Sequence, residues 1–582
     1  MVPRIAPLVC LLAFCLVGAA GAQAKGVGSS SALTKTGSTT TAANPEAPVP
    51  VEASDTPPIG RRLSSNRVLQ IADALPKMRA VRAHYRGSYG GAYSKGPGRW
   101  QVSYFSKKGQ EIGQVVIADR NGRVLEQWTG FQIAWSMARG YPGAFGRHVN
   151  ALYIWIPLCV LFFVPFLDWR KPLRLLHLDL LVLLSFSVSL AYFNHGRIYT
   201  STPFVYPPLA YLLVRMIALG RVGRRRREHP TGEPRRIRLL VPTPLLAIGV
   251  VFLAGFRVGL NVTDSNVIDV GYAGVIGAQR IVHDKSLYGG YPSDNEHGDT
   301  YGPVNYETYV PFQQVFGWSG HWDDLPAAHA AAIVFDLLAV ALLFLLGRRV
   351  RGPALGIALA YAWVAYPFTL FALESNSNDS LVAVLVLAAL LVASSAPARG
   401  MFAALAGLTK FAPLALAPLL CTEGFAGMTR ARRMRSGALF AGAFLLTAAI
   451  VMVPALTHDS LHTIFQRTFS YQANRESPFS VWGLYESSTA LEDGQIAVQG
   501  AALALALAVA VLPRRFDLVG LGATAAAVLI AVQLGIDHWF YLYIPWFFGL
   551  AMLALLGQFS WSPAQMRDAP SESARSSRLA AV

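Results

Sequence analysis

The sequence predicts a mainly α-helical polytopic membrane protein with roughly 11 spans, a re-entrant segment and one small extracytoplasmic α+β domain. The first observation is composition: the 582 residues are 53% hydrophobic and 14% charged, whereas average soluble domains carry about 25% charged residues. The second is that apolar runs alternate with short polar connectors from residue 150 onward. The third is that arginines concentrate in these connectors, where they act as topology signals. The net charge of +17 therefore does not indicate a nucleic-acid partner.

The N-terminal segment predicts secretion. Residues 1–24 contain one basic residue, an apolar core and the small-residue site Ala22-Gln23-Ala24, which is typical of a signal peptide. An uncleaved membrane anchor is the alternative, and in both cases the next segment is expected outside the cytoplasm. Residues 25–62 are rich in Ser, Thr, Ala and Pro, and this composition predicts a disordered linker.

A small folded domain is predicted over residues 63–146. Residues 64–85 have apolar positions at helical spacing, and residues 99–107 alternate like a half-buried strand. Residues 114–128 read as a hairpin around the turn Asp119-Arg120-Asn121-Gly122. The phrases W-x-V-x-Y and V-x-I-A-D-x-x-G-x-V resemble a PepSY domain. This resemblance implies an extracytoplasmic module that inhibits or regulates, so no catalysis is expected here.

The remaining chain is expected to cross the membrane repeatedly. Apolar runs of about 17–22 residues suit single spans, and they lie near 150–167, 173–193, 203–220, 239–259, 326–346, 353–373, 380–395, 437–456, 497–512, 518–535 and 539–557. The Arg-rich connectors, expected in the cytoplasm, are residues 168–174, 221–238, 347–352, 430–435 and 513–517. Alternation then predicts that residues 194–202, 260–325, 374–379, 457–496 and 535–538 lie outside.

One apolar run breaks this alternation. Residues 400–420 lie between two segments that are both expected inside, and the run contains Lys410, Pro413 and Pro418. A re-entrant pair of half-helices satisfies both facts, because irregular backbone at membrane depth is tolerated inside protein. An ordinary span beside one misassigned neighbour is the alternative. The tail, residues 558–582, is expected in the cytoplasm.

The longest outside loop, residues 260–325, is polar and aromatic. It begins with Asp264 and Asp269 and contains several tyrosines. Aromatic faces and carboxylates together can recognise a sugar, because rings cover C–H groups while carboxylates accept hydroxyl hydrogens. The same residues also suit an aromatic belt at the membrane interface. Composition alone leaves both interpretations open.

A set of phrases in the chain resembles GT-C glycosyltransferases, most closely glycosyltransferase family 87, the alpha-mannosyltransferase-like family. An acidic residue just outside a span precedes G-A-x-x-I-x-x-x-x-x-L-Y, D-T-Y-G-P-V-N-Y and Y-V-P-F. Further phrases are Gly407-Leu408-Thr409-Lys410, Asn474-Arg475-Glu476-Ser477-Pro478-Phe479-Ser480, Trp482-Gly483-Leu484-Tyr485 and Asp537-His538-Trp539. The resemblance covers roughly residues 239–557. The acidic loop normally follows the first span, whereas here residues 147–238 add three accessory spans first.

The resemblance implies a hexosyltransferase of the cell envelope. It implies a polyprenyl-phosphate sugar as donor, mannose as the expected hexose, and a glycan or lipid acceptor outside the cytoplasm. The enzyme is then expected in the cell membrane, with its active site facing outside and inversion of configuration at the sugar.

Two acidic residues are candidates for the catalytic base. Such a transfer needs a group that takes the acceptor's hydroxyl proton and cations that stabilise the leaving phosphate. Asp269 is the first candidate and Asp264 the second. For Asp264, helix capping together with Ser265 and Asn266 is an equal alternative.

Four basic residues are candidates for binding the phosphate. Lys410 is the first, because a lysine inside an apolar run is costly to insert and by default marks a site; its alternative is snorkelling. Arg475 is next, followed by Arg467, and both could equally be solvated loop charges. His538 could equally be a satisfied interfacial histidine.

Four further residues are candidates for binding the sugar or the acceptor: Asp299, Tyr301, Tyr306 and Trp482. Asn376, Asn378 and Asp379 are interpreted as supporting residues, the last two as helix caps. No metal motif stands out and no cofactor is certain, because the histidines of the long loop lack ligand spacing. A divalent cation is therefore optional, and the lipid-linked sugar is a co-substrate.

The alternative function is a transporter or flippase of a lipid or small solute. A transporter would be expected to show an internal repeat and charged residues within several spans. No clear repeat is found, and most predicted spans are read as free of ionisable residues apart from Asp336 and Lys410. A non-catalytic sensory protein, regulated by the N-terminal domain, would leave the loop 260–325 unexplained.

Overall fold

The computed structural model describes residues 48–140, 145–221, 237, 239–475, 477–485, 488–512 and 514–561. The chain divides into two compact units. Of the described residues, one unit contains 48–140 and 193–198, and the other contains those of 145–192 and 199–561. The predicted signal peptide, most of the basic connector 221–238 and most of the C-terminal tail lie outside the described residues.

The smaller unit is an antiparallel sheet with two helices, α2 (Ser65–Asp73) and α3 (Pro76–His84). The strand order follows the sequence: β1 (Val49–Val51), β2 (Tyr89–Ser94), β3 (Arg99–Phe105), β4 (Glu111–Ala118) and β5 (Val124–Thr129). The strand and hairpin predicted from the alternation are confirmed as β3, β4 and β5. The predicted helix is two helices, because Leu75 is extended before Pro76, as residues preceding proline prefer.

The core of this unit lies between its helices and its sheet. Trp100, Val102 and Ile117 are fully buried against Val68 and Met78. Alternation along β3 and β4 supplies one apolar face, and α2 and α3 supply the other. The domain therefore has the helix-on-sheet architecture that the sequence predicts.

The folded part begins earlier than the predicted linker allowed. Residues 49–51 form β1, which pairs with β2 through Val49 and Ser94. Further on, the Asp119 carboxylate accepts hydrogen bonds from the backbone N–H groups of Arg62 and Leu63 and from the Trp100 indole. These contacts use backbone groups, which composition does not reveal. The expected boundary at residue 62 is thus corrected to before residue 49.

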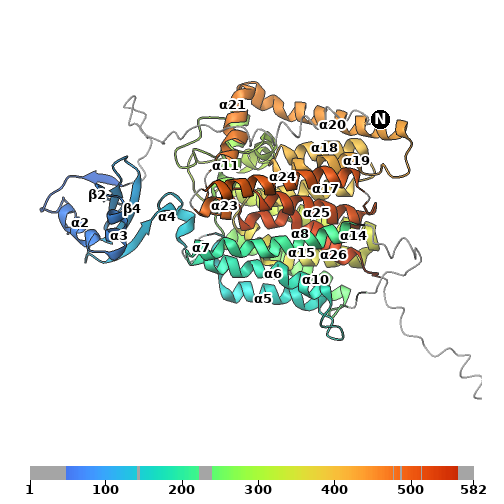
Figure 1. The fold of residues 1–582 in the computed structure, drawn as a ribbon, viewed down its shortest axis with the longest axis horizontal. Coiled ribbons are helices and arrows are strands. Elements are labelled where there is room, and N and C mark those ends of the chain that lie inside the picture. Colours follow the sequence, from blue (N-terminus) through green and yellow to red (C-terminus); the bar gives the residue numbers. More distant parts are fainter. Residues whose placement is uncertain are drawn as a thin grey trace, which may run out of the picture. The chain divides into compact units, whose positions relative to one another are not determined.

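The larger unit is a helical bundle (Figure 1). Six helical stretches in the described part of the chain are apolar and long enough to cross a membrane: Leu175–Asn194 (α6), Ile198–Gly220 (α7 to α8), Thr243–Asp264 (α10), Pro326–Arg351 (α14), Arg430–Leu456 (α20) and Thr489–Val511 (α24). A helix of 22 residues such as α10 spans about 33 Å at 1.5 Å per residue, close to the hydrocarbon thickness of a bilayer. These six confirm apolar helices at six predicted positions.

The predicted count of roughly 11 spans is not confirmed. Within the described residues, up to seven spans meet the length criterion if the bent pair α15 (Pro353–Ala365) and α16 (Pro367–Glu374) counts as one. The other four predicted positions hold shorter apolar helices: Leu152–Phe166, Asp379–Leu391 (α17), Leu518–Leu534 (α25) and Tyr541–Gly557. A further short apolar helix, Ala412–Thr422, lies in the run that was predicted to be re-entrant. Hydropathy marks apolar runs but does not show where a helix ends inside the protein.

The sequence predicts one continuous span over residues 353–373, but the structure has a helix break there, between α15 and α16. The two helices meet at an angle of 58°. Pro367 has no N–H to continue the ladder, and Tyr366 before it adopts an extended conformation with ψ of 125°. The bend directs the C-terminal end of α16, Glu374, into the protein, where it is fully buried.

The predicted break in the run 400–420 is confirmed as a break of the helix, while its membrane topology stays a prediction. Helix α18 (Ala396–Gly407) ends before Lys410, and the chain resumes with η5 (Ala412–Leu416) and α19 (Ala417–Thr422). The free carbonyls of Leu408 and Thr409 accept hydrogen bonds from the backbone N–H groups of Val304 and Gly302. Irregular backbone is thereby satisfied inside the protein.

Three predicted spans contain ionisable residues that the sequence interpretation overlooked. Arg257 in α10 is fully buried and forms an ion pair with Asp336 in α14, at 2.5 Å and 3.1 Å. Asp179 in α6 is also fully buried and pairs with Arg215 of α8 (Tyr206–Gly220) at 2.9 Å. Both charges of each pair have a partner, so these residues connect neighbouring helices. The argument against a transporter from uncharged spans is corrected accordingly.

Backbone contacts in the larger unit join segments that the alternation predicts on the same side, while the membrane topology itself stays a prediction. The backbone N–H groups of Asn266 and Ile268 donate to the carbonyls of Glu374 and Ser375. This contact joins two loops expected on the same side. Among the basic connectors, the Arg515 N–H donates to the Gly220 carbonyl. Figure 1 shows α11 (Asp269–Val282) and α21 (Leu461–Phe465) toward one end of the bundle.

Candidate active site

A buried ion pair between Lys410 and Asp379 forms the centre of the candidate site. The Lys410 ammonium lies 2.6 Å from Oδ1 of Asp379. The same oxygen accepts a hydrogen bond of 2.8 Å from the Trp546 indole of α26 (Ile544–Gly557). The Asp379 side chain is 1% exposed and that of Lys410 9%. Removing either charge would leave the other buried without its partner, which typically costs about 3–5 kcal/mol.

Three aromatic rings surround the ammonium of Lys410. Its nitrogen lies 5.4 Å from the ring centre of Tyr301, 5.2 Å from that of Tyr543 and 5.2 Å from that of Trp546. Tyr543 and Trp546 stack with their centres 4.4 Å apart. Such a contact stabilises a desolvated cation by about 2 kcal/mol or more. The rings therefore fix the ammonium in one position and limit its access to water.

Asp379 is held by a buried polar loop between α16 and α17. All residues from Glu374 to Asp379 are at most 1% exposed. Asn376 has a positive φ of 49°, and its side-chain amide donates to Ser265 and to the carbonyl of Asn266. Asn378 occupies the N-cap position of α17 without making a capping bond, and its amide instead donates to Asn305 at 2.5 Å. The predicted capping role of Asn378 and Asp379 is therefore wrong.

The same buried loop positions Asp269, the first residue of α11. Ile268, directly before it, donates its N–H to the carbonyl of Ser375. Gly271 packs so closely on the loop that a Cβ atom there would lie 2.3 Å from the carbonyl oxygen of Asn376. The Asn295 side chain donates to the backbone carbonyl of Asp269. Asp269 and Asp379 thus belong to one rigid assembly.

The charges of both candidate cations act on the Asp269 carboxylate. Its side chain is open to water, yet the protein around it raises its pKa through desolvation, while Arg475 and then Lys410 act to lower that pKa. The Asp379 charge acts to raise it. The two cations therefore lie within electrostatic reach of this carboxylate, as the sequence interpretation expects for a base beside a phosphate site.

His538 lies beside the same group of charges. Its Nδ1 atom is 2.9 Å from the Ser477 hydroxyl, and its ring contacts Phe479 and Tyr543. Burial lowers its pKa well below the usual value, and the charges of Arg475 and Lys410 lower it further. The imidazole is therefore neutral at pH 7. It can exchange hydrogen bonds with a ligand but brings no positive charge to a phosphate.

Tyr301 is brought to Lys410 by a close approach of two backbones. Gly302, the next residue, donates its N–H to the carbonyl of Thr409, beside Lys410. A Cβ atom at position 302 would lie 1.9 Å from the carbonyl oxygen of Leu408. Burial and the nearby carboxylate of Asp269 raise the pKa of the Tyr301 phenol, so it remains a neutral hydrogen-bond donor.

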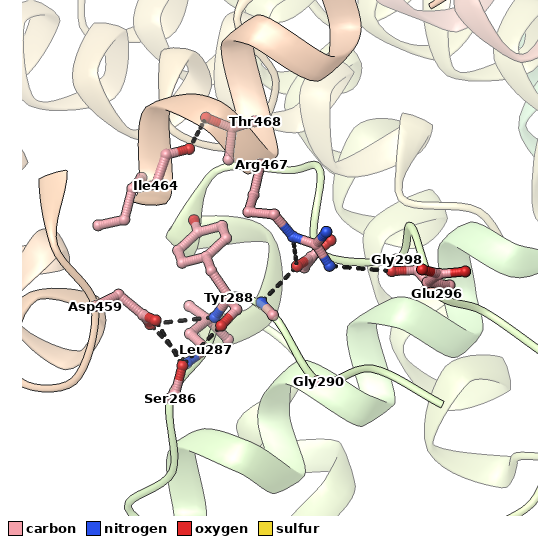
Figure 2. Close-up of polar contacts among 12 residues, drawn as sticks. Ser286, Leu287, Tyr288, Gly290, Glu296, Gly298, Asp459, Ile464, Arg467 and Thr468 are labelled. Carbon is pink, nitrogen blue, oxygen red and sulfur yellow. Dashed lines mark hydrogen bonds and ion pairs between the residues drawn. The ribbon is translucent and has the colours of Figure 1, made fainter. Parts of the chain in front are cut away.

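Two other predicted residues pair with each other instead of meeting Lys410. Asp299 is 1% exposed, and its Oδ2 atom accepts hydrogen bonds of 2.6 Å from Arg467 and from the Gly289 N–H. Figure 2 shows Arg467 extending to this loop. Asp459 contacts an earlier part of the same loop, at Ser286, Leu287 and Tyr288. The pair connects the long loop to the segment after α20. Arg467 was expected to bind phosphate and Asp299 to bind sugar, but in the structure each pairs with the other.

Three further predicted residues form polar contacts with other parts of the protein. The Asp264 carboxylate forms an ion pair with His148. Tyr306 is fully buried; its hydroxyl donates to the carbonyl of Gly298 and accepts from the backbone N–H of Tyr301, so it supports the loop that carries Tyr301. The Trp482 indole donates to the carbonyl of Leu534 at 2.9 Å. These side chains thus hold loops together, and we do not include them in the candidate site.

Sequence reasoning missed the partners of Lys410. Asp379 was interpreted as a cap, and Tyr543 and Trp546 were not singled out. One signal could have identified Asp379: a lysine at membrane depth requires a buried anion, and Asp379 begins an apolar run. Tyr543 and Trp546 carry no comparable signal, because aromatic residues at a span end also suit an interfacial belt.

Within the described residues, the structure contains no group of three or more His, Cys, Asp or Glu side chains that could hold a metal ion. What the cluster offers is an accessible carboxylate at Asp269, the cations Lys410 and Arg475, and a neutral imidazole at His538. This set can accept a proton on one side of a reacting atom and receive a negative charge on the other.

Replacing Gly302 with alanine tests whether the backbone contact positions Tyr301. The added methyl group collides with the Leu408 carbonyl, so the loop must move; we expect the melting temperature in detergent to fall, with a loss of about 1–3 kcal/mol typical of overpacking. Gly259→Ala in α10 is the matched control, because a Cβ atom there meets nothing within 4 Å. Equal melting temperatures for both variants would contradict the contact.

The comparison with known families agrees with this geometry. The sequence profile of glycosyltransferase family 87 matches residues 300–536. No curated protein matches the chain. The matched region contains Tyr301, Asp379, Lys410 and Arg475, and it begins after Asp269. The match supports a glycosyltransferase family for the part of the chain that carries the Lys410 cluster.

Proposed function

We propose that this protein is a membrane glycosyltransferase that moves a hexose, mannose first among the candidates, from a polyprenyl-phosphate sugar to an envelope acceptor outside the cytoplasm. The observation that carries the proposal is the accessible Asp269 carboxylate beside the cations Arg475 and Lys410. The family match over residues 300–536 supports the reaction class. A sugar donor with a phosphate leaving group suits this arrangement, because the two cations can stabilise the phosphate while the base accepts a proton.

In the proposed reaction, Asp269 accepts the proton of an acceptor hydroxyl. The oxygen attacks the anomeric carbon of the sugar, and the bond from that carbon to the phosphate oxygen breaks. The electron pair leaves with the lipid phosphate, whose extra negative charge Lys410 and Arg475 stabilise. Attack opposite the leaving phosphate inverts the configuration. Asp269 ends protonated and is restored by releasing that proton to solvent.

The residues around Lys410 make this cation suitable for the task. Asp379 and the three rings fix the ammonium before substrate arrives, so little reorganisation is needed when charge develops on the phosphate. Oδ2 of Asp379 is buried without a hydrogen-bond partner. The pair therefore keeps an acceptor available close to the ammonium. A sugar hydroxyl or a water can satisfy this atom when the donor is bound.

We further propose that the site faces outside a cell membrane and that the smaller unit is a PepSY-like regulatory module. The predicted signal peptide supports an outside location for this module, and the separation of Arg-rich connectors from the site loops supports the orientation. A divalent cation remains optional in this scheme, because Lys410 and Arg475 already supply positive charge.

A transfer assay tests the function directly. Membranes containing the protein receive radiolabelled polyprenyl-phosphate mannose, and incorporation into endogenous acceptors is measured. Asp269→Asn is expected to lower transfer about 10²- to 10⁴-fold, the usual contribution of a general base. Asp264→Asn is the matched control, because that carboxylate pairs with His148, and it should retain most activity. Equal transfer by the wild type and Asp269→Asn would refute the assigned base.

A transporter is the second candidate, because the buried pairs Arg257–Asp336 and Arg215–Asp179 lie in spanning helices. Protein reconstituted in vesicles distinguishes the two functions. Movement of the labelled donor across the bilayer without any transfer to membrane acceptors would support the transporter.

The acid limb of the pH–activity profile should reflect the raised pKa of Asp269. The base acts only when deprotonated, so activity is lost as the pH falls through this pKa, which desolvation by the surrounding protein raises above 3.8. Since Arg475 acts to lower this pKa, Arg475→Gln should shift the acid limb to higher pH in addition to slowing transfer. The measurement is transfer rate against pH at saturating donor. An acid limb at an unchanged pH would contradict the proximity of the two groups.

A further inference from the structure

Beyond the site itself, two segments of the larger unit meet along a continuous seam. We define the seam as residues 284–300 of the long loop and residues 458–472 after α20. His458 contacts Asp284 at 2.8 Å, and Asp459 accepts hydrogen bonds from Ser286 and from two backbone N–H groups of the loop. Figure 2 shows this end of the seam together with Arg467. The first residues of one segment therefore contact the first residues of the other.

The seam continues to the residues next to the site. His297 stacks on Tyr471 with ring centres 4.6 Å apart, and Gln472 donates to the Thr300 hydroxyl at 3.0 Å. Tyr301 follows Thr300 directly, and Arg475 follows Gln472 by three residues. One end of the seam therefore carries a ring that contacts Lys410 and a cation that acts on Asp269.

The centre of the seam is the ion pair between Asp299 and Arg467. Oδ2 of Asp299 accepts from Arg467 and Gly289, and its Oδ1 atom is buried without a partner. Arg467 lies in a π-helical turn, Gln466–Ser470. Such turns are rare and often occur at functional sites. Burying the charge of Asp299 has a desolvation cost, and a neutral hydrogen-bonded pair could join the two loops without that cost.

Tyr471, which stacks on His297, senses the charges of both this pair and the site. The pKa of its phenol is raised by burial, and the charges of both Arg475 with Asp269 and Arg467 with Asp299 act on it. The two charge pairs are therefore close enough to share a neighbour. A shift of one segment against the other would move Tyr301 and Arg475 relative to each other.

We infer that Asp299 and Arg467 are positioning residues: their ion pair couples the loop that ends at Tyr301 to the segment that ends at Arg475, and so sets both sides of the phosphate site together. This inference rests on the proposed glycosyl transfer. It assigns to Arg467 and Asp299 an effect on the rate of the chemical step rather than contact with substrate. A displacement of about 1 Å at a reacting centre can lower a rate about 10²-fold.

The test compares Asp299→Asn, Arg467→Gln and the double variant, all in the full chain. Each single variant leaves one unpaired charge, so both the melting temperature and the transfer rate should fall. The double variant has no unpaired charge, so its melting temperature should return toward the wild type. Its kcat with polyprenyl-phosphate mannose should nevertheless stay about 10- to 100-fold low with little change in KM, because amides do not restore the charged contact. Recovery of kcat together with stability would overturn the inference.

A second variant covers the case in which the double variant stays unstable. Arg467→Lys keeps the charge but loses the planar geometry of the guanidinium, so stability should be near that of the wild type while kcat remains reduced. Wild-type values of both would overturn the inference. His458→Gln is the matched control, because its partner Asp284 is 90% exposed, and it should leave kcat unchanged.

Hydrogen exchange gives a readout that does not depend on activity. Loss of the pair should speed amide exchange both at residues 300–302 and at residues 471–475, in the double variant as well. Faster exchange confined to residues next to position 299 or 467 would indicate a local structural role and contradict the coupling. If the wild type transfers no sugar, the proposed function fails; if it transfers sugar and the double variant matches it, only the coupling fails.

Discussion

A single buried charge, the ammonium of Lys410, sets the requirements for the structure around it. In its buried position this cation requires an anion, and Asp379 supplies it at 2.6 Å. Asp379 can lie there only because α16 and α17 are separated by a buried polar loop. The same loop holds the start of α11 and hence Asp269. The break after α18 brings Lys410 to Gly302, and thereby to Tyr301. The backbone segments that surround this one buried charge therefore also position the candidate base Asp269 and the ring of Tyr301.

Much of the fold could be predicted because hydropathy and charge are local signals. The strands β3 to β5, six spanning helices and the break near Lys410 follow from alternation, run length and an out-of-place lysine with two prolines. The number of spans could not be predicted in this way. Helices such as α17 and α25 are shorter than a span and are buried inside the bundle, so their apolar residues pack against neighbouring helices. The early strand β1 uses only backbone pairing, which leaves no trace in composition.

The candidate site was predictable where a residue type conflicts with its surroundings. Lys410 in an apolar run and Arg475 in a loop predicted to lie outside are such conflicts, and the charges of both act on Asp269 in the structure. Asp299, Arg467 and Asp264 were chosen for their charge alone, and all three have protein partners: Arg467 pairs with Asp299, and Asp264 pairs with His148. Charge in a loop does not distinguish a ligand contact from an ion pair 168 residues away in sequence. Only the fold brings such partners together.

In the proposed reaction, Lys410 and Arg475 receive the phosphate of a lipid-linked sugar beside Asp269. A cryo-EM structure of the full chain with a non-hydrolysable polyprenyl-phosphonate sugar would show this arrangement directly. We expect density for the phosphonate within hydrogen-bond distance of both cations, with the anomeric carbon on the side of Asp269. Density for the phosphonate away from Lys410, or on the far side of the Asp379 loop from Asp269, would contradict it.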